Sequence, residues 1–416
     1  MISPLPPAAR RNAPVPRRKL AGPVLSPWRG GHSEASGRPP ARLTATLCRA
    51  EEQFAGLAGD WDGLRRRNRS ATPFTSHTWL ASWWRSYGQG GRLRIVLVRE
   101  NGRLVAAAPL MLVHRPLPAL VPLGGPISDY QDVLLDDGCP RAADALARAL
   151  YAASRSAVID LREVRPGGAA ERLYAAWPGA RRRLTDSPCL ELPGVPMEEM
   201  LRRLAPASAK RTRRKLRRID ELGIEAHAVT GERVADAVRT MLRLHERQWE
   251  GRGVTPEHLR PRFVAHLVRA TARLAADGDA TVTEYRIGDR VAACDIAFTS
   301  PDLVCGYLYG ADPALRERKV DIATMLLRHD AHFASATGRG TLSLLRGTEP
   351  YKQRWQPVTS VNRRYLLARR ELAPVLELHA AQAAARDLAA GALREHGASG
   401  RACTLLSRAA GLRAGR

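Results

Sequence analysis

The residues best suited to chemistry lie close together in the run LLRGTEPYKQRW, at residues 344–355. Glu349 is a candidate general base, because a carboxylate can take the proton that an ammonium must lose before its nitrogen attacks a carbonyl carbon. Lys352 is a second candidate, since a compact ammonium suits a point contact with an oxyanion, a phosphate or a carboxylate. Lysine is also rare here, with five among the 66 basic residues. The alternatives are an ion pair of Glu349 with Arg346 or Lys352, and an ordinary surface lysine.

The other residues of this run depend on how the preceding strand ends. Gly347 allows the chain to turn sharply there. Arg346 and Tyr351 are candidates for contacts with a substrate. Tyr351 and Trp355 could instead pack against the edge of the strand.

Further candidates stand elsewhere in the chain. His245 and Trp249 in LHERQW are four residues apart, so they share one face of a helix, and His245 is a candidate base or substrate ligand or else a structural histidine. Asp129 and Asp132 in SDYQD could bind a cationic amine or could cap a loop. Asp295 is the lone charge in VAACDIAFT, and a buried strand carboxylate must be either paired or functional.

Several common catalytic motifs are absent. The sequence contains no Walker loop, no GxSxG, no HExxH and no dinucleotide-binding fingerprint. The six cysteines are scattered, without a CxxC pair or a histidine at ligand spacing, so we expect no metal site. Unpaired cysteines and the lack of a signal peptide favour a reducing cytoplasm. The most apolar run, residues 104–125, is broken by charge and proline, so no membrane span is expected.

The net charge of +25 invites a nucleic-acid partner, but an excess of arginine over lysine is also what a GC-rich genome encodes. We therefore regard nucleic acid as an unlikely partner. The most basic segment is SAKRTRRKLRRIDELG, at residues 208–223. It predicts either a solvated amphipathic helix or a helix that grips phosphates of a nucleotide tail or of tRNA. The absence of aromatic residues weakens a base-stacking role.

The pattern of elements predicts an α/β protein with one order of elements used twice. Residues 1–42 are rich in Pro, Gly, Ser and Arg and are expected to be disordered. In the first half we expect helices at 43–67, 76–88 and 140–155, and strands at 93–100, 103–112, 128–135 and 156–163. In the second half we expect helices at 232–253, 256–278 and 321–338, and strands at 280–287, 290–299, 303–310, 340–347 and 360–370. Residues 371–416 read as a helical extension.

Both hairpins place Val-Ala-Ala after the turn, in RENGRLVAAAPL and in YRIGDRVAACDI. This similarity suggests two copies of one domain that join near residues 190–230. With the motifs WLxxWW at residues 79–84 and RGxExYKxxW at residues 346–355, the chain resembles the CelD-type acetyltransferase family. That family belongs to the GNAT superfamily and is similar to the Fem aminoacyl-transferases, which carry two such domains in tandem. The resemblance covers residues 43–370.

The resemblance implies a tandem pair of GNAT-like domains, each a mixed, mostly antiparallel sheet flanked by helices, at residues 43–200 and 201–370. It implies transfer of an acyl group, expected to be acetyl, from acyl-CoA to an amine of a small molecule or of a cell-envelope or polysaccharide precursor. Glu349 would be the base, and Lys352 with backbone amides would stabilise the oxyanion. Arg316, Lys319 and Ile322 would bind the donor near the start of the helix at 321–338, whose N-terminus would face the pyrophosphate.

One departure concerns the donor. The superfamily pattern Arg/Gln-x-x-Gly-x-Gly/Ala reads here as Arg316-x-x-Lys319-x-Asp321, without a glycine and with a negative charge where phosphate is expected. Two other functions therefore remain open. One is an aminoacyl-tRNA-dependent transferase of the Fem type, which the basic segment favours and the lack of a long helical arm opposes. The other is a degenerate, non-catalytic binding protein.

Overall fold

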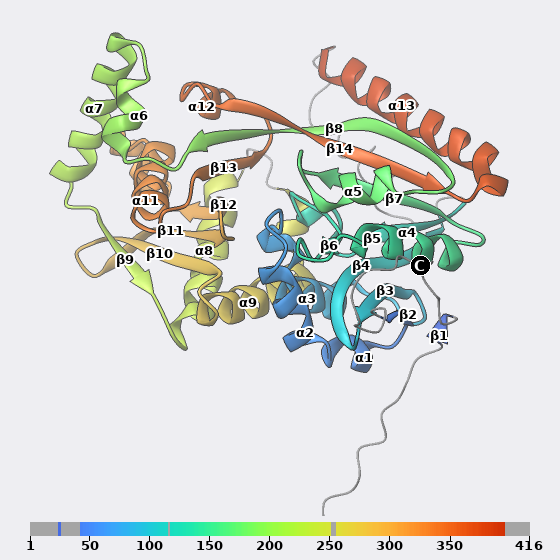
Figure 1. Ribbon diagram of the computed structural model, residues 1–416. Helices are drawn as coiled ribbons and strands as arrows, with labels where there is room; N and C mark the ends of the chain where they lie inside the picture. Colours follow the sequence, from blue (N-terminus) through green and yellow to red (C-terminus); the bar gives the residue numbers. More distant parts are fainter. Residues whose placement is uncertain (1–23, 26–41, 115–116, 251–254, 396–416) are drawn as a thin grey trace, which may run out of the picture.

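The computed structural model describes residues 24–25, 42–114, 117–250 and 255–395. Within these ranges fourteen strands form one continuous mixed sheet (Figure 1). Its order is β1-β2-β3-β4-β5-β7-β14-β8-β13-β12-β11-β10-β9, with β6 paired to β4. The two halves of the chain supply the two ends of the sheet, so the site depends on how they meet in its middle.

The first half builds one end of the sheet and covers it with helices on both faces. Asn101 and Gly102 at the tip of the β3–β4 hairpin have φ angles of 50° and 85°, as the predicted turn requires. The helices and strands are β2 (Leu43–Cys48), α1 (Glu51–Ala55), α2 (Ala58–Arg66), α3 (His77–Tyr87), β3 (Leu93–Glu100), β4 (Arg103–His114), β5 (Pro118–Pro122), β6 (Leu134–Leu135), α4 (Ala142–Ala153), β7 (Val158–Val164), α5 (Ala169–Ala175) and β8 (Ala180–Pro193).

The second half repeats this order and builds the other end. Short helical turns at 256–259 and 370–372 precede α9 and α13. The elements are α6 (Met197–Arg202), α7 (Pro206–Glu221), β9 (Glu225–Val229), α8 (Arg233–Trp249), α9 (Pro261–Ala276), β10 (Ala280–Ile287), β11 (Arg290–Thr299), β12 (Leu303–Ala311), α10 (Ala314–Glu317), α11 (Ile322–Ala336), β13 (Thr341–Arg346), α12 (Pro350–Gln353), β14 (Val358–Ala368) and α13 (Ala373–Glu395).

The halves exchange their last strands. β14 lies between β7 and β8, and β8 lies between β14 and β13. Each half is therefore completed by a strand of the other, and the two long strands run side by side across the upper part of Figure 1. The predicted domain limits at residues 200/201 and 370/371 stay predictions. β8 and β14 each pair with a strand of the other half, so the sheet runs on without a break where the two halves meet.

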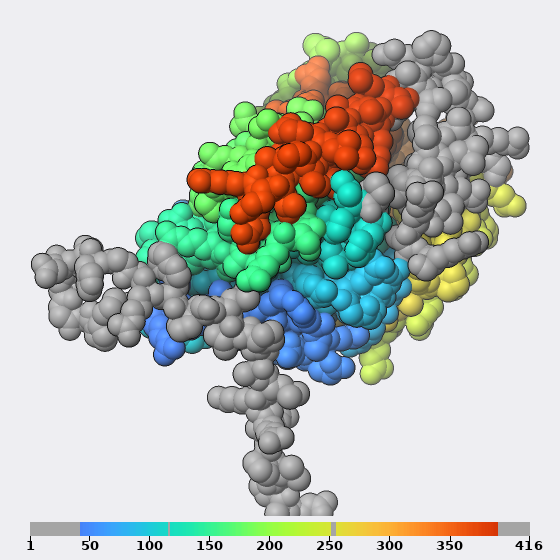
Figure 2. All heavy atoms as spheres, turned by 90° about the vertical axis from the view of Figure 1, so that its right-hand side faces the viewer, coloured from blue at the N-terminus to red at the C-terminus, as the bar shows by residue number. Residues whose placement is uncertain are grey.

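Two apolar layers flank the part of the sheet that the second half of the chain builds. α8 and α9 cover one face, together with α3 from the first half, around residues such as Met241, Phe263 and Phe298. α6, α7 and α11 cover the other face, around residues such as Ile219, Met325 and Leu342. α13 lies across the surface beside β8 and β14, where Leu376 packs against Val158 and Leu366 (Figure 2).

The structure departs from the local predictions at several places. Residues 43–48 form a strand, because LTATLC pairs along its whole length with β3, and this long-range pairing outweighs the helical pattern that follows it. Residues 128–133 are not a strand, and only Leu134–Leu135 pair. The strand β8 was not predicted. Val24–Leu25 (β1) pairs with β2 inside the tail expected to be disordered, whereas residues 1–23, 26–41 and 396–416 lie outside the described ranges.

None of the described helices has the length and apolar composition needed to span a bilayer.

Candidate functional site

Strands β12 and β13 separate to form a notch. They run parallel and pair at three positions, of which the last is Cys305 with Ser343. On its other edge β13 pairs with β8 at residues 341–343 and again at Arg346, and β12 continues to Ala311 beside β11. Residues 306–309 of β12 are only partly buried. The notch therefore leaves one edge of β12 without a strand partner among the described residues, and β5 and β7 separate in the same way after two pairs in the first half.

A negatively charged side chain of the protein itself, that of Asp321, lies at the start of α11. Asp321 caps the helix by accepting a hydrogen bond from the Thr324 amide at 2.9 Å. Its carboxylate is also bound by Lys215 of α7 at 2.6 Å and by both terminal nitrogens of Arg354, at 2.7 and 2.8 Å. These partners hold the pKa of Asp321 well below its usual value, although burial opposes them. Two cations therefore face one carboxylate, and the local charge is not negative.

The loop before α11 keeps the conformation that glycine favours. Lys319 has a φ of 58°, in the left-handed region that a β-carbon disfavours. Its amide donates to the Arg316 carbonyl, and the Val320 amide donates to the Leu315 carbonyl. Arg316 and Lys319 are exposed, and Ile322 is the first residue of the helix. The missing glycine thus leaves the turn intact and adds a cation to it.

Glu349 and Lys352 form an ion pair at the end of β13. The ammonium of Lys352 lies 2.9 Å from the Glu349 carboxylate and donates a 2.7 Å hydrogen bond to the carbonyl of Arg346. Lys352 is buried, whereas half of the Glu349 side chain is exposed. A β-carbon on Gly347, whose φ is 104°, would lie 2.6 Å from both carboxylate oxygens. Gly347 therefore makes room for the carboxylate, and the expected alternative of an ion pair is realised.

Arg346 joins the halves. Its guanidinium donates to Asp129 at 2.9 Å, to Glu163 at 3.2 Å and to the Pro126 carbonyl at 2.6 Å. The two carboxylates raise the pKa of Arg346 against the effect of burial. Asn362 of β14 donates to the same Glu163 at 3.0 Å. Asp129 and Arg346 therefore bind each other, a structural use of two residues predicted to contact substrate.

Asp132 caps a helix. Its carboxylate accepts hydrogen bonds from the amides of Ala169 and Ala170 at the start of α5, and from its own neighbour Val133. Burial raises the pKa of this carboxyl to about 7, and the three amides act in the opposite direction. These contacts favour the capping role that was the alternative to substrate binding.

His245 is held from both ring nitrogens. Nδ1 lies 2.7 Å from the carbonyl oxygen of Tyr309, a residue of β12 in the notch, so Nδ1 carries the proton. Nε2 then accepts from Nδ1 of His258 at 3.1 Å. Burial lowers the pKa of both rings, that of His258 to about 4. The Trp249 ring lies 6.4 Å from His245. We therefore interpret His245 as a residue that positions β12. This is the structural role that was the alternative to a base or substrate ligand.

Two remaining predictions lie on either side of the notch. Tyr351 is 43% exposed beside Lys352, whereas Trp355 is buried in the core that contains α11. Asp295 is buried on the face of β11 that α11 covers, and Asp330 of α11 raises its pKa together with burial. Asp330 was not predicted, because a single aspartate in an amphipathic helix reads as a solvent-facing residue.

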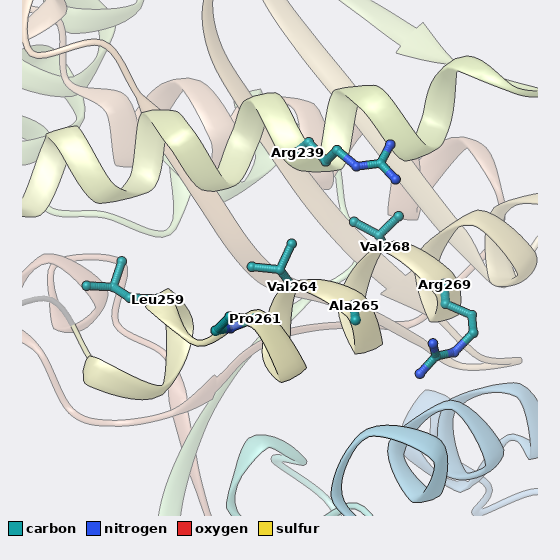
Figure 3. Close-up of a pocket in the computed structure, with 7 residues that line it drawn as sticks. All are labelled: Arg239, Leu259, Pro261, Val264, Ala265, Val268 and Arg269. Carbon is teal, nitrogen blue, oxygen red and sulfur yellow. The ribbon is translucent and has the colours of Figure 1, made fainter.

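A groove between two helices lies elsewhere. It measures about 490 Å³ and runs between α8 and α9, lined by Arg239, Leu259, Pro261, Val264, Ala265, Val268 and Arg269 (Figure 3). None of these residues belongs to the notch, and the lining has no carboxylate or imidazole that could take up a proton. We therefore place the candidate site at the notch on chemical grounds.

The structure brings two sets of predicted residues together and leaves the others apart. Glu349, Lys352, Arg346 and Tyr351 meet at the end of β13, and Arg316, Lys319 and Ile322 meet before α11. Lys215 and Arg354 link the start of α11 to α7 and to the end of α12 through the Asp321 carboxylate. No sequence signal pairs Lys215 with Asp321, which is 106 residues away. Within the described ranges no three His, Cys, Asp or Glu side chains are arranged to hold a metal ion.

Comparison with known proteins agrees with this geometry. Residues 198–353 match the family described as acetyltransferase (GNAT) domain. The structure is similar to that of FemX, with a TM-score of 0.56 and 11% identity over 77% of this chain and 98% of that one. It is also similar to a conserved protein of unknown function from Bacteroides thetaiotaomicron, with a TM-score of 0.52 and 13% identity over 78% of this chain and 99% of that one. No curated protein sequence is significantly similar. The predicted resemblance and the tandem GNAT-like fold are confirmed.

Proposed function

We propose that the protein transfers an acyl group from acyl-CoA to the amine of a small molecule or of a cell-envelope or polysaccharide precursor, because residues 198–353 match the acetyltransferase (GNAT) domain family. The observation that carries this proposal is the notch between β12 and β13, which has Glu349 and Lys352 at one side and the start of α11 at the other. Acetyl is the simplest donor group to test.

The phosphates of the donor would meet side-chain cations before α11. Arg316 and Lys319 are exposed there, and Lys215 and Arg354 form ion pairs with the Asp321 carboxylate. A helix N-terminus and nearby cations attract phosphate oxygens. Asp321 already occupies one amide of this helix, so side chains would contribute more of the binding than backbone amides do.

Glu349 is the group that would accept the proton of the acceptor ammonium. Its half-exposed carboxylate can reach solvent and substrate. The resulting neutral amine would attack the thioester carbon, so that a C–N bond forms and the C–S bond breaks, and the thiolate leaves with a proton. The ammonium of Lys352 has three N–H bonds, and the Glu349 carboxylate and the Arg346 carbonyl occupy two of them. The third can stabilise the oxyanion.

The test is amine-dependent release of thiol from acetyl-CoA, measured across a panel of primary amines. We expect Glu349→Gln to lower kcat by roughly 10²–10⁴-fold, as loss of a general base does. Glu246→Gln, on the exposed side of α8, is the matched control and should leave kcat unchanged. If acetyl-CoA neither binds nor releases thiol with any amine, the proposal fails and the non-catalytic alternative gains.

A tRNA-dependent transfer is the second candidate, because α7 exposes a row of cations. Thr212, Leu216 and Ile219 face the core, and the exposed side consists of Lys210, Arg211, Arg214, Arg217 and Arg218. Such a surface binds phosphate backbones in a salt-dependent manner. Binding of aminoacyl-tRNA at moderate salt, lost in Arg211→Glu/Arg214→Glu, would favour this candidate over acyl-CoA.

A further inference from the structure

The strand β13 contains a bulge directly after it parts from β12. Ser343 is paired with Glu191 of β8, and the next pair joins Arg346 to Cys189. β13 therefore advances by three residues over a stretch in which β8 advances by two, as in a β-bulge. Within the bulge Leu345 has a φ of 59°, a left-handed conformation that a bulky side chain disfavours. Such a residue keeps its conformation only where the surrounding contacts hold it.

The bulge decides on which face of the sheet Arg346 lies. Side chains alternate along a regular strand, so Ser343 and Arg346, three residues apart, would point to opposite faces. Their partners on β8 are two residues apart and share a face, and paired residues lie on the same face. The extra residue therefore turns Arg346 to the side of Ser343, where its guanidinium binds Asp129 of the first half at 2.9 Å.

A buried hydroxyl group holds the bulge. The Leu345 amide donates a hydrogen bond of 3.1 Å to Oγ of Ser343, two residues earlier. Serine side chains stabilise local turns in this way. Ser343 is 0% exposed, so water does not compete for its hydroxyl group.

Tyr130 of the first half binds the same hydroxyl group. The phenol oxygen and Oγ of Ser343 share a hydrogen bond of 2.8 Å. Glu191 lies 3.4 Å from the phenol oxygen, and Arg165 holds that carboxylate with two hydrogen bonds of 2.8 and 3.1 Å. Tyr130 is buried and directly follows Asp129, so one segment of the first half contacts both ends of the bulge.

The bulge is connected to the candidate base by short contacts. The Arg346 carbonyl accepts the 2.7 Å hydrogen bond of Lys352, whose ammonium lies 2.9 Å from the Glu349 carboxylate. The Gly347 amide donates to the Pro188 carbonyl at 3.2 Å, which keeps this turn against β8. A displacement of Arg346 would therefore move Lys352 and Glu349 with it.

We propose that Tyr130 and Ser343 are positioning residues for the acyl transfer. Their paired hydroxyl groups hold the bulge at Leu345, and the bulge sets the position of Glu349 beside the notch. A base must lie within hydrogen-bond reach of the proton that it takes, and a misplacement of about 1 Å can cost roughly 100-fold in rate. This inference rests on the proposed function, and it gives the first half a part in the reaction.

The test is a double-mutant cycle on the release of thiol from acetyl-CoA. We expect Ser343→Ala to lower kcat by roughly 10- to 100-fold in the wild type but by less than about twofold in Glu349→Gln, because the position of the base matters only while the base is present. Tyr130→Phe should lower kcat by roughly 3- to 10-fold, since it keeps the ring and removes one hydrogen bond. The KM for acetyl-CoA should stay within about twofold, because neither change touches the start of α11.

Ser154→Ala is the matched control. Ser154 is 1% exposed, and its hydroxyl group lies 3.5 Å from the Tyr151 carbonyl at the end of α4. The substitution therefore makes the same chemical change at equal burial, and kcat should not change.

Hydrogen exchange followed by mass spectrometry examines the bulge without any need for activity. Peptides that cover residues 344–353 should exchange about tenfold faster in Ser343→Ala than in the wild type or in Ser154→Ala.

Three results would overturn the inference while thiol release by the wild type left the proposed function standing. They are an equal loss of kcat from Ser343→Ala in both backgrounds, an unchanged kcat in Ser343→Ala, and unchanged exchange of residues 344–353. A wild type that releases no thiol with any amine would instead refute the proposed function, and the positioning role with it, whatever the exchange shows.

Discussion

Lys352 is bound to the backbone of Arg346 by a 2.7 Å hydrogen bond from its ammonium to the carbonyl oxygen, and the lysine itself is buried. The bond closes the turn that carries Glu349. We expect Lys352→Met to lower the free energy of unfolding by about 1–3 kcal/mol, because a buried acceptor loses its donor. Urea unfolding measures this effect, and Lys210→Met on the exposed side of α7 should change it by less than about 0.5 kcal/mol. Equal stability of the two variants would contradict the structural role of Lys352.

Arg364 and Asp160 connect the exchanged strand β14 to β7 through two hydrogen bonds of 2.6 and 2.7 Å. Both side chains are more than nine-tenths buried. Arg364→Met should lower the free energy of unfolding by roughly 3–5 kcal/mol, since it leaves a buried carboxylate without its partner. Adding Asp160→Asn should recover part of the loss. Arg182→Ala, which breaks an exposed pair with Glu377, is the control and should cost at most about 0.5 kcal/mol.

The Asp321 carboxylate should make stability depend on pH in one direction. Its pKa is lowered in the folded protein, so it contributes stability above the unfolded-state value of 3.8, and this contribution is lost as pH falls through the folded-state value. Asp321→Asn keeps a capping oxygen and loses the charge. We expect the variant to be less stable than wild type by about 1 kcal/mol at pH 7, a modest figure because the partners are partly exposed. The difference should shrink below pH 4. A difference that is constant from pH 7 to pH 3 would contradict the ion-pair assignment.

The same substitution should act on the donor in the opposite sense. Asp321→Asn releases Lys215 and Arg354 and removes a negative charge beside the proposed phosphate site. We expect roughly fivefold tighter binding of acetyl-CoA, equivalent to about 1 kcal/mol, and measurable by calorimetry at low salt. Unchanged affinity would place the phosphates elsewhere.

Lys319 combines a strained backbone with a useful charge. Lys319→Gly should raise the free energy of unfolding by up to about 1 kcal/mol, because glycine adopts a φ of 58° without the β-carbon penalty. Lys319→Ala keeps the penalty and should bring no gain. Both variants should bind acetyl-CoA more weakly than wild type if the ammonium contacts phosphate, so stability and affinity separate the two roles.

Local signals in the sequence account for much of the fold. The two hairpins were predictable because Asn101-Gly102 and Gly288-Asp289 fix the turns and the flanking strands are rich in β-branched residues. β8 was not predictable. Its sequence ARRRLTDSPCLELP mixes charge, proline and apolar residues, and its partners β13 and β14 lie more than 140 residues later in the chain. No local pattern encodes a strand whose pairing is entirely distant.

In the candidate site, too, some contacts were predictable from the sequence and others were not. Glu349 and Lys352 could be read as a pair because they are three residues apart. The partners of Asp321 and the position of Asp330 behind Gly306 depend on how α7 and α11 pack, which spacing along the chain does not reveal. Asp129 and Arg346, 217 residues apart, were predicted separately as substrate ligands, and the fold uses them on each other.

The exchange of β8 and β14 has a consequence for biosynthesis. A chain growing on the ribosome exposes the edges of β7 and β8 while β14, the last of the described strands, is still inside the tunnel. Open strand edges recruit other chains, so this interval is a period of risk for aggregation. Neither half can complete its sheet before translation has passed residue 368. A prematurely terminated product therefore keeps an open edge, which marks it for chaperones and proteases.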